Sequence, residues 1–287
     1  MTVTAFTKFA AAGTVFALSA VLFFPASFHT PVFAKESPPI QLEIPAVDGV
    51  LLLGEELTYN VSYSIFDLGE VKVQIIDTVT KGGMKIYKTK AFIDSYSGIP
   101  FVDLHQVFYS EVTRKFYSEF FTVHNTAKPE EMPYTQYAFD YENKKAHFEL
   151  GSKPKNITVK KGSETITDYQ QDGLSLFYFA RNNVREKKKI KTPIFINEKS
   201  YFTEFNFMNK PGSQEIDAVD YPIETIEFEG NANFIGIFGL TGYFRGFFSN
   251  DEASVPIVAK MKVLVGSIHI ELTKWNRPGW TPPLAKK

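Results

Sequence analysis

The sequence contains no cysteine among its 287 residues, which excludes disulfide bonds and any lipid attached through a cysteine thiol. It also lacks an excess of one charge, because 31 Lys and Arg stand against 32 Asp and Glu. A balanced charge argues against a nucleic acid partner, whose phosphates select a strongly basic surface. The fold must therefore depend on the burial of apolar side chains.

Sequence motifs that are typical of enzymes are missing as well. The chain has no Gly-x-Ser-x-Gly elbow, no His-Glu-x-x-His pair and no phosphate-binding loop. The sequence indicates no cofactor. We therefore expect a protein without catalytic activity.

Only one long apolar run is present, over residues 9–24. It follows Lys8, ends at Pro25, and precedes a Val32-Phe-Ala34 sequence that is typical of signal-peptide cleavage after Ala34. The run is shorter than the roughly 20 residues that a membrane-spanning helix needs. We expect an exported, periplasmic protein with no transmembrane span after cleavage; secretion to the extracellular medium is the alternative.

The rest of the chain predicts a single domain. Removal of 34 of the 287 residues leaves 253, a size at which all-β domains often remain undivided. Residues 35–53 contain three prolines and predict an extended lead-in. One antiparallel β domain is expected over residues 54–274, followed by a tail over residues 275–287 that contains both tryptophans.

Alternation of apolar and polar residues predicts the strands. Residues 57–65 place Leu57, Tyr59 and Val61 on one face. The same pattern continues over residues 70–80 and 85–93, with turns at 67–69 and 81–83, and over eight later segments. The sequence therefore predicts a mainly β protein built as a large curved antiparallel sheet or half-closed β barrel, because so long a sheet must hide its edges.

Residues 242–272 predict a hairpin. The two ends are strand-like, the middle is a polar turn, and residues 260–274 form the second strand. Gly266 interrupts this strand where a β bulge or bend is expected.

One or two short helices are expected. Residues 172–183 form the stronger candidate, because Asp172 can cap the first turn and apolar residues recur at helical spacing up to Arg181. Residues 101–109 form a weaker candidate.

Three stretches together resemble an exported bacterial family known as domain of unknown function 3108. They are residues 54–59 with 68–70, residues 172–181, and residues 248–251 with 255–256 and 266–268. The resemblance implies export and a mostly β fold but no established activity. The fold it implies is similar to that of periplasmic lipoprotein carriers, in which a half-closed barrel grips acyl chains beneath a helical lid; residues 172–183 would be that lid. Residues 252–254 are Glu-Ala-Ser where the family usually has basic residues, which argues against anion binding there.

Aromatic residues are abundant, with 28 Phe, 14 Tyr and 2 Trp. They either fill a core or line a cavity on the concave side of the sheet. We expect the protein to bind an apolar or amphipathic ligand, a lipid or a lipidated partner, against Tyr59, Tyr63, Phe177 and Phe244. The alternative is a structural or assembly protein of the cell envelope with a filled core. The oligomeric state is left open.

Two surface features are candidates for contact with a partner or a membrane. The basic segment 185–191 contains Lys187, Lys188 and Lys189, and the tail contains Trp275 and Trp280. The alternatives are a solvated loop that keeps a sheet edge from pairing, and a tail that packs across the sheet edge.

Two His-x-Glu pairs are weak candidates for metal ligands. They are His147 with Glu149, and His269 with Glu271, and strand geometry puts both members of each pair on one face. A metal site and a metal-dependent hydrolase would require the two pairs to converge. The plainer interpretation is two solvated polar strand faces.

Overall fold

The computed structural model describes residues 49–99, 103–236, 241–263 and 266–286. All of them belong to one unit that spans residues 44–287. The expected signal peptide over residues 1–34 and most of the expected lead-in over residues 35–53 lie outside the described residues. No helix among the described residues is long and apolar enough to cross a membrane.

Fourteen antiparallel strands form one sheet, in two meanders joined through the middle. The first meander contains β1 (Glu56–Tyr63), β2 (Phe66–Lys81), β3 (Met84–Ser95), β4 (His105–Thr113), β5 (Ser118–Asn125), β6 (Pro133–Asp140), β7 (Lys145–Ser152) and β8 (Ile157–Thr165). The second contains β9 (Lys188–Ile196), β10 (Lys199–Gln214), β11 (Ile223–Ala232), β12 (Gly242–Ser249), β13 (Pro256–Lys262) and β14 (Ser267–Asn276). The first and last strands, β1 and β14, pair with each other at the centre of the sheet.

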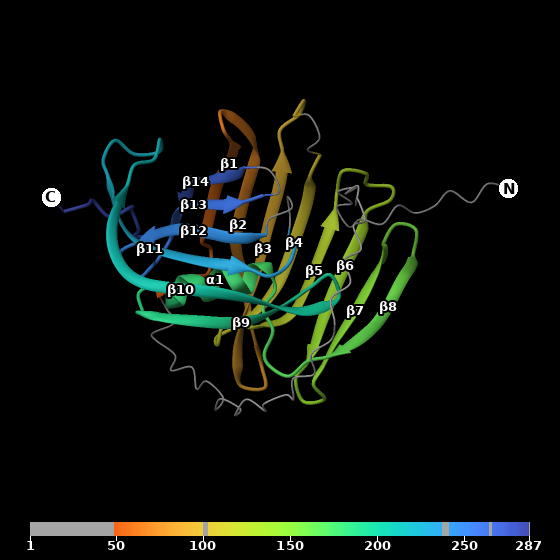
Figure 1. Ribbon diagram of the computed structural model, residues 1–287. Coiled ribbons are helices and arrows are strands. Elements are labelled where there is room, and N and C mark those ends of the chain that lie inside the picture. The colour runs from red at the N-terminus through yellow and green to blue at the C-terminus, as the bar shows by residue number, and fades with distance from the viewer. Residues whose placement is uncertain (1–48, 100–102, 237–240, 264–265, 287) are drawn as a thin grey trace, which may run out of the picture. The chain divides into compact units, whose positions relative to one another are not determined.

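The sheet curls back on itself but does not close. Its end strands are β8 and β9, and Figure 1 shows β9–β12 crossing over β2–β5 with the helix α1 (Gly173–Asn183) between the two layers. Side chains join the two ends: the Phe195 ring lies 4.9 Å from that of Tyr137, and Lys160 pairs with Glu198 at 2.8 Å. The predicted curved, half-closed antiparallel sheet is confirmed.

The helix begins where the sequence predicts. The Asp172 carboxylate accepts hydrogen bonds from the backbone N–H groups of Leu174 and Ser175, at 2.7 and 3.0 Å, and the Ser175 hydroxyl accepts from the Asp172 N–H in return. This capping box satisfies donors that the first turn leaves free. Ser110 of β4 also donates to Asp172, which fixes the start of α1 against the first meander.

Apolar side chains form two clusters inside the fold. The first apolar cluster surrounds α1 and contains buried residues of both meanders, such as Ile75, Phe108, Phe179, Phe205 and Phe228. The second apolar cluster lies around the central strands and contains Leu57, Tyr59, Ile223, Val255, Ile257 and Leu272. Val71 and Phe177 contact both clusters and are only partly buried.

Four local predictions were wrong. Residues 101–109 include the start of strand β4, in which Phe108, Ser110 and Val112 alternate toward the interior. The first turn lies at Ser64, whose φ is 56°, and residues 67–69 belong to β2. Residues 260–274 divide into β13 and β14, because Gly266, with φ of 79°, helps form the turn between them. Most of the basic segment 185–191 belongs to β9, which the sequence pattern did not reveal.

Candidate functional site

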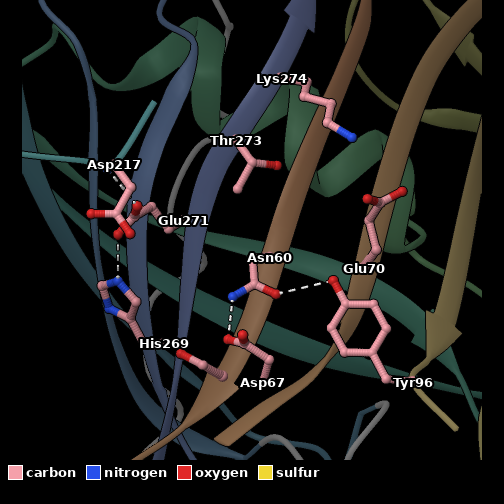
Figure 2. Close-up of a pocket in the computed structure, with 10 residues that line it drawn as sticks. Asn60, Asp67, Glu70, Tyr96, Asp217, His269, Glu271, Thr273 and Lys274 are labelled. Atoms are coloured by element: carbon pink, nitrogen blue, oxygen red, sulfur yellow. Dashed lines mark hydrogen bonds and ion pairs between the residues drawn. The ribbon is translucent and has the colours of Figure 1, made fainter. Parts of the chain in front are cut away.

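A pocket of about 430 Å³ opens on the outer face of the sheet beside β1, β2 and β14. We call it the outer pocket, and Figure 2 shows that its side chains come mainly from these three strands. It is lined by Asn60, Ser62, Asp67, Glu70, Tyr96, Asp217, His269, Glu271, Thr273 and Lys274. Strand alternation explains its polarity, since Asn60 and Ser62 face away from the interior that Tyr59 and Val61 help to fill.

Short hydrogen bonds order the walls of the outer pocket. Asn60 donates to the Asp67 carboxylate at 2.6 Å and accepts from the Tyr96 hydroxyl at 3.3 Å. Across the pocket, His269 Nε2 lies 3.2 Å from the Glu271 carboxylate. These polar side chains therefore bond to one another.

The outer pocket does not hold a metal-ligand set. Within the described ranges, three or more His, Asp or Glu side chains do not gather as ligands for one ion. His147 and Glu149 lie on β7, and six strands separate β7 from β14, which carries His269 and Glu271. The two His-x-Glu pairs therefore do not meet, and each occupies a polar strand face.

A second polar group lies inside the fold. We call Glu55, Arg181 and Arg277 the inner ion cluster. Arg181, on α1, is 1% exposed, and its guanidinium binds both oxygens of the Glu55 carboxylate, at 2.5 and 2.9 Å. Glu55 is also 1% exposed and accepts a further hydrogen bond from Arg277. Two buried cations therefore share one buried carboxylate.

Charge pairing decides the ionisation of the inner ion cluster. Burial alone would raise the pKa of the Glu55 carboxyl, but the charges and hydrogen bonds of Arg181 and Arg277 lower it overall. Burial likewise opposes the charge on Arg181, yet the neighbouring Glu55 carboxylate raises the Arg181 pKa. Both groups are therefore ionised at neutral pH.

The inner ion cluster ties together segments that are far apart in the sequence. Arg181 donates to the backbone carbonyls of Ala253 and Ser254, at 2.9 and 3.2 Å, in the turn between β12 and β13. Arg277 donates to the carbonyl of Gly49. One cluster thus fixes the residues before β1, the end of α1, the β12–β13 turn and the residues after β14.

Three of the four expected lining residues lie in the interior. Tyr59 is 4% exposed in the second apolar cluster, and the Phe244 ring lies 5.6 Å from Phe205 and 6.1 Å from Phe228. Phe177, on α1, lies where the two apolar clusters meet. Tyr63 is half-buried at the end of β1, with its ring against Gly266.

The expected partner contacts lie at two separate places. Lys187 and Lys189 are exposed, and Lys188 is the first residue of the end strand β9, where it pairs with Glu186 at 2.5 Å. Trp275 and Trp280 are half-buried against the second apolar cluster, with ring centroids 5.7 Å apart. Further along the tail, the Pro283 carbonyl accepts from the Glu224 N–H, so the tail packs along the start of β11.

Sequence reasoning missed the inner ion cluster, although it placed Arg181 on the helix and noted the stretch that contains Glu55. The available signal was the position of Arg181, which shares the buried helix face with Leu174 and Tyr178. An arginine at an apolar position of a buried helix requires an anion nearby. The first two stretches that suggested the family contain Glu55 and Arg181, the third flanks the turn around Ser254, and the structure brings all three together.

Comparison with known proteins gives a family and a solved structure. No curated protein matches the sequence. The crystal structure of a β-barrel-like protein of domain of unknown function DUF1849 from Brucella abortus is 13% identical over 79% of this chain and 98% of that chain, with a TM-score of 0.49. The family profile described as "Protein of unknown function (DUF3108)" matches residues 58–273, and the chain therefore belongs to that family.

Proposed function

We propose that this protein is a non-catalytic binding protein of the cell envelope that holds an apolar or amphipathic ligand, a lipid or a lipidated partner, inside the curved sheet. Export is part of the proposal and depends on the signal-peptide pattern of residues 1–34. The ligand would be held by burial of apolar surface, with no covalent chemistry.

One observation carries this proposal: the interior is divided into two apolar clusters, and partly exposed side chains lie where they meet. Val71 and Phe177 contact both clusters yet remain partly accessible to solvent. Apolar side chains at such a junction give a hydrocarbon chain a surface to cover without unfolding either cluster. The sheet does not close between β8 and β9, whose ends are joined by side-chain contacts and not by a strand ladder.

Analysis of what the protein carries tests this proposal. The chain is expressed with residues 1–34 in place, purified without detergent, and examined by native mass spectrometry and solvent extraction. A stoichiometric lipid that is lost in Phe177→Ala is the expected result. Phe202→Ala is the matched control, because Phe202 is 41% exposed and belongs to neither apolar cluster. A ligand-free protein that also takes up no lipid from envelope extracts would contradict the proposal.

A second candidate is a structural or assembly protein of the envelope. The observation that favours it is the end strand β8, where Ile157 and Val159 are 43% and 60% exposed beside an unpaired strand edge. Such an edge can accept a strand from another chain. Val159→Pro would block pairing at this edge, and loss of a cross-linked partner in that variant would favour assembly over ligand binding.

A further inference from the structure

Two buried tyrosine hydroxyls lie near the inner ion cluster without a hydrogen-bond partner among the described residues. Tyr59, on β1, is 4% exposed and Tyr178, on α1, is 0% exposed. Buried hydroxyls are nearly always paired, because leaving one unpaired forfeits its hydration without compensation. Two such groups in one region require an explanation.

Arg181 lies beside both tyrosines. Its Cζ atom is 5.5 Å from the centre of the Tyr178 ring, and Tyr178 and Arg181 are three residues apart on one helix face. The Arg181 and Glu55 charges both influence the pKa of Tyr59, which burial raises. The two phenols and the guanidinium therefore lie within electrostatic range of one another.

Counting donors at Arg181 leaves one N–H group. A guanidinium has five N–H groups. Arg181 uses Nε toward Ser254, one Nη1 hydrogen toward Glu55, and both Nη2 hydrogens toward Glu55 and Ala253. The second Nη1 hydrogen has no assigned acceptor in the part of the chain that the structure describes.

The Glu55 carboxylate has already used three of its roughly four acceptor sites. The Glu55 carboxylate accepts two hydrogen bonds from Arg181 and one from Arg277. A bound group that accepts hydrogen bonds would pair with the two phenol O–H groups and the remaining N–H at once, and a single negative charge suits one guanidinium N–H. A carboxylate meets these conditions, whereas a phosphate monoester would bring close to two charges into the same buried place.

Partly exposed apolar side chains adjoin this place. Val71, on β2, is the direct cross-strand neighbour of Tyr59, and Phe177 precedes Tyr178 on α1. Both are the partly exposed side chains that join the two apolar clusters. A hydrocarbon chain against these residues would bring its terminal polar group to the two hydroxyls.

We propose that Tyr59, Tyr178 and Arg181 bind the carboxylate of a single-chain amphiphile, such as a long-chain fatty acid, while its hydrocarbon chain lies against Val71 and Phe177. This inference rests on the proposed binding function and specifies its ligand class. It gives the two hydroxyls the acceptor that they lack among the described residues.

Paired ligands test the carboxylate separately from the hydrocarbon chain. Binding of palmitic acid and of hexadecanol is measured by displacement of a fluorescent apolar probe from the full-length protein. The native protein should bind the acid at least about 10-fold more tightly, since hydrogen bonds to a charged group contribute more than those to a neutral one. Tyr59→Phe with Tyr178→Phe should reduce this preference, leaving only the part that Arg181 contributes, and should leave hexadecanol binding unchanged.

A matched variant controls for the loss of any phenol. Tyr221→Phe removes a hydroxyl that donates to the Pro282 carbonyl at 3.0 Å and to no group of the inner ion cluster, and should retain the preference for the acid. The carboxylate assignment would be overturned if the native protein bound acid and alcohol equally well. It would also be overturned if the double variant kept the native preference. Neither result would contradict the proposed binding function. Binding of neither ligand would remove the proposed function as well. Circular dichroism confirms that each variant is folded.

Discussion

The inner ion cluster and the outer pocket lie on opposite faces of the central strands. Each contains a carboxylate paired with a basic side chain, but the first pair is buried and the second is partly exposed to solvent. Glu55 and Arg181 are each 1% exposed and bind each other through two hydrogen bonds. His269 and Glu271 also form a pair, at 3.2 Å, but their side chains are 35% and 21% exposed. Burial is the main difference between the two pairs.

This comparison shows what a polar group contributes in each setting. In water an ion pair replaces hydration that each partner would otherwise keep, so it adds little stability. Inside the protein the partners have given up their hydration, and loss of either one leaves the other charged and unpaired. The inner ion cluster should therefore decide whether the four segments that it joins stay together, whereas the outer pocket should tolerate change.

Removal of the buried arginine should have the largest effect. Arg181→Met leaves the Glu55 carboxylate buried with only Arg277 beside it, and should lower the free energy of unfolding by about 3–5 kcal/mol. Urea denaturation measures this loss. Lys88→Met is the control, because Lys88 pairs with Asp77 at 3.1 Å while the two side chains are 38% and 55% exposed, and should cost about 1 kcal/mol or less. Similar losses in the two variants would contradict the distinction between buried and exposed pairs.

The next largest effect should be a loss of stability at the inner ion cluster as the pH is lowered. The pKa of Glu55 is lowered in the folded protein, so its contribution is present above the unfolded pKa of about 4.3 and is lost as the pH falls through the lower folded value. Each unit by which the pKa is lowered contributes about 1.4 kcal/mol. Melting temperatures measured from pH 7 to pH 3 should fall less steeply in Glu55→Gln than in the native protein. A native slope in Glu55→Gln would refute this account.

Deletion of the unpaired hydroxyls should be stabilising. Tyr59→Phe and Tyr178→Phe each remove a buried hydroxyl without a described partner, and we expect a gain of about 1 kcal/mol from each. Tyr221→Phe removes a hydroxyl that is hydrogen-bonded, and should lose about 1 kcal/mol instead. Thermal denaturation without added lipid measures both the expected gain in stability and the expected loss. A loss of stability in all three variants would mean that the interior hydroxyls have partners after all.

The smallest effect is expected in the outer pocket. His269→Ala removes the partner of Glu271 on a solvated face, and should change the free energy of unfolding by about 0.5 kcal/mol or less. Urea denaturation at pH 7 is sufficient. A loss above about 2 kcal/mol would show that the outer pocket is as important to the fold as the inner ion cluster.

The fold could be predicted from the sequence where the pattern is local. Alternation over residues 57–65 predicted β1, and Asp172 predicted the start of α1, because strand faces and helix caps depend on residues close in the chain. Strand β9 was missed because Lys188, Lys189 and Lys191 hide its alternation; lysines are also what protects a strand at the end of a sheet. The β4 segment was misassigned as a helix because a short apolar run fits both the helical and the strand periodicity.

The interior site could be predicted only in part. Alternation placed Tyr59 on the inner face, and helical spacing placed Phe177 on α1. The pairing of Glu55 with Arg181 joins residues 126 positions apart, and that with Arg277 joins residues 222 apart. Periodicity carries no information at such separations, so the inner ion cluster had to be found in three dimensions.

The pairing of β1 with β14 has a consequence for how the molecule forms. The first of the described strands to be made has its permanent neighbour in the last of them, since Glu56 lies opposite Asn276. Each meander can assemble from contacts close in the chain, but the join between them must wait for a loop of more than 200 residues to close. Contacts so distant slow folding, and until they form β1 presents an open strand edge to any neighbouring chain. A newly made molecule is therefore most exposed to misassembly at its centre, which becomes its most protected part once the last strand arrives.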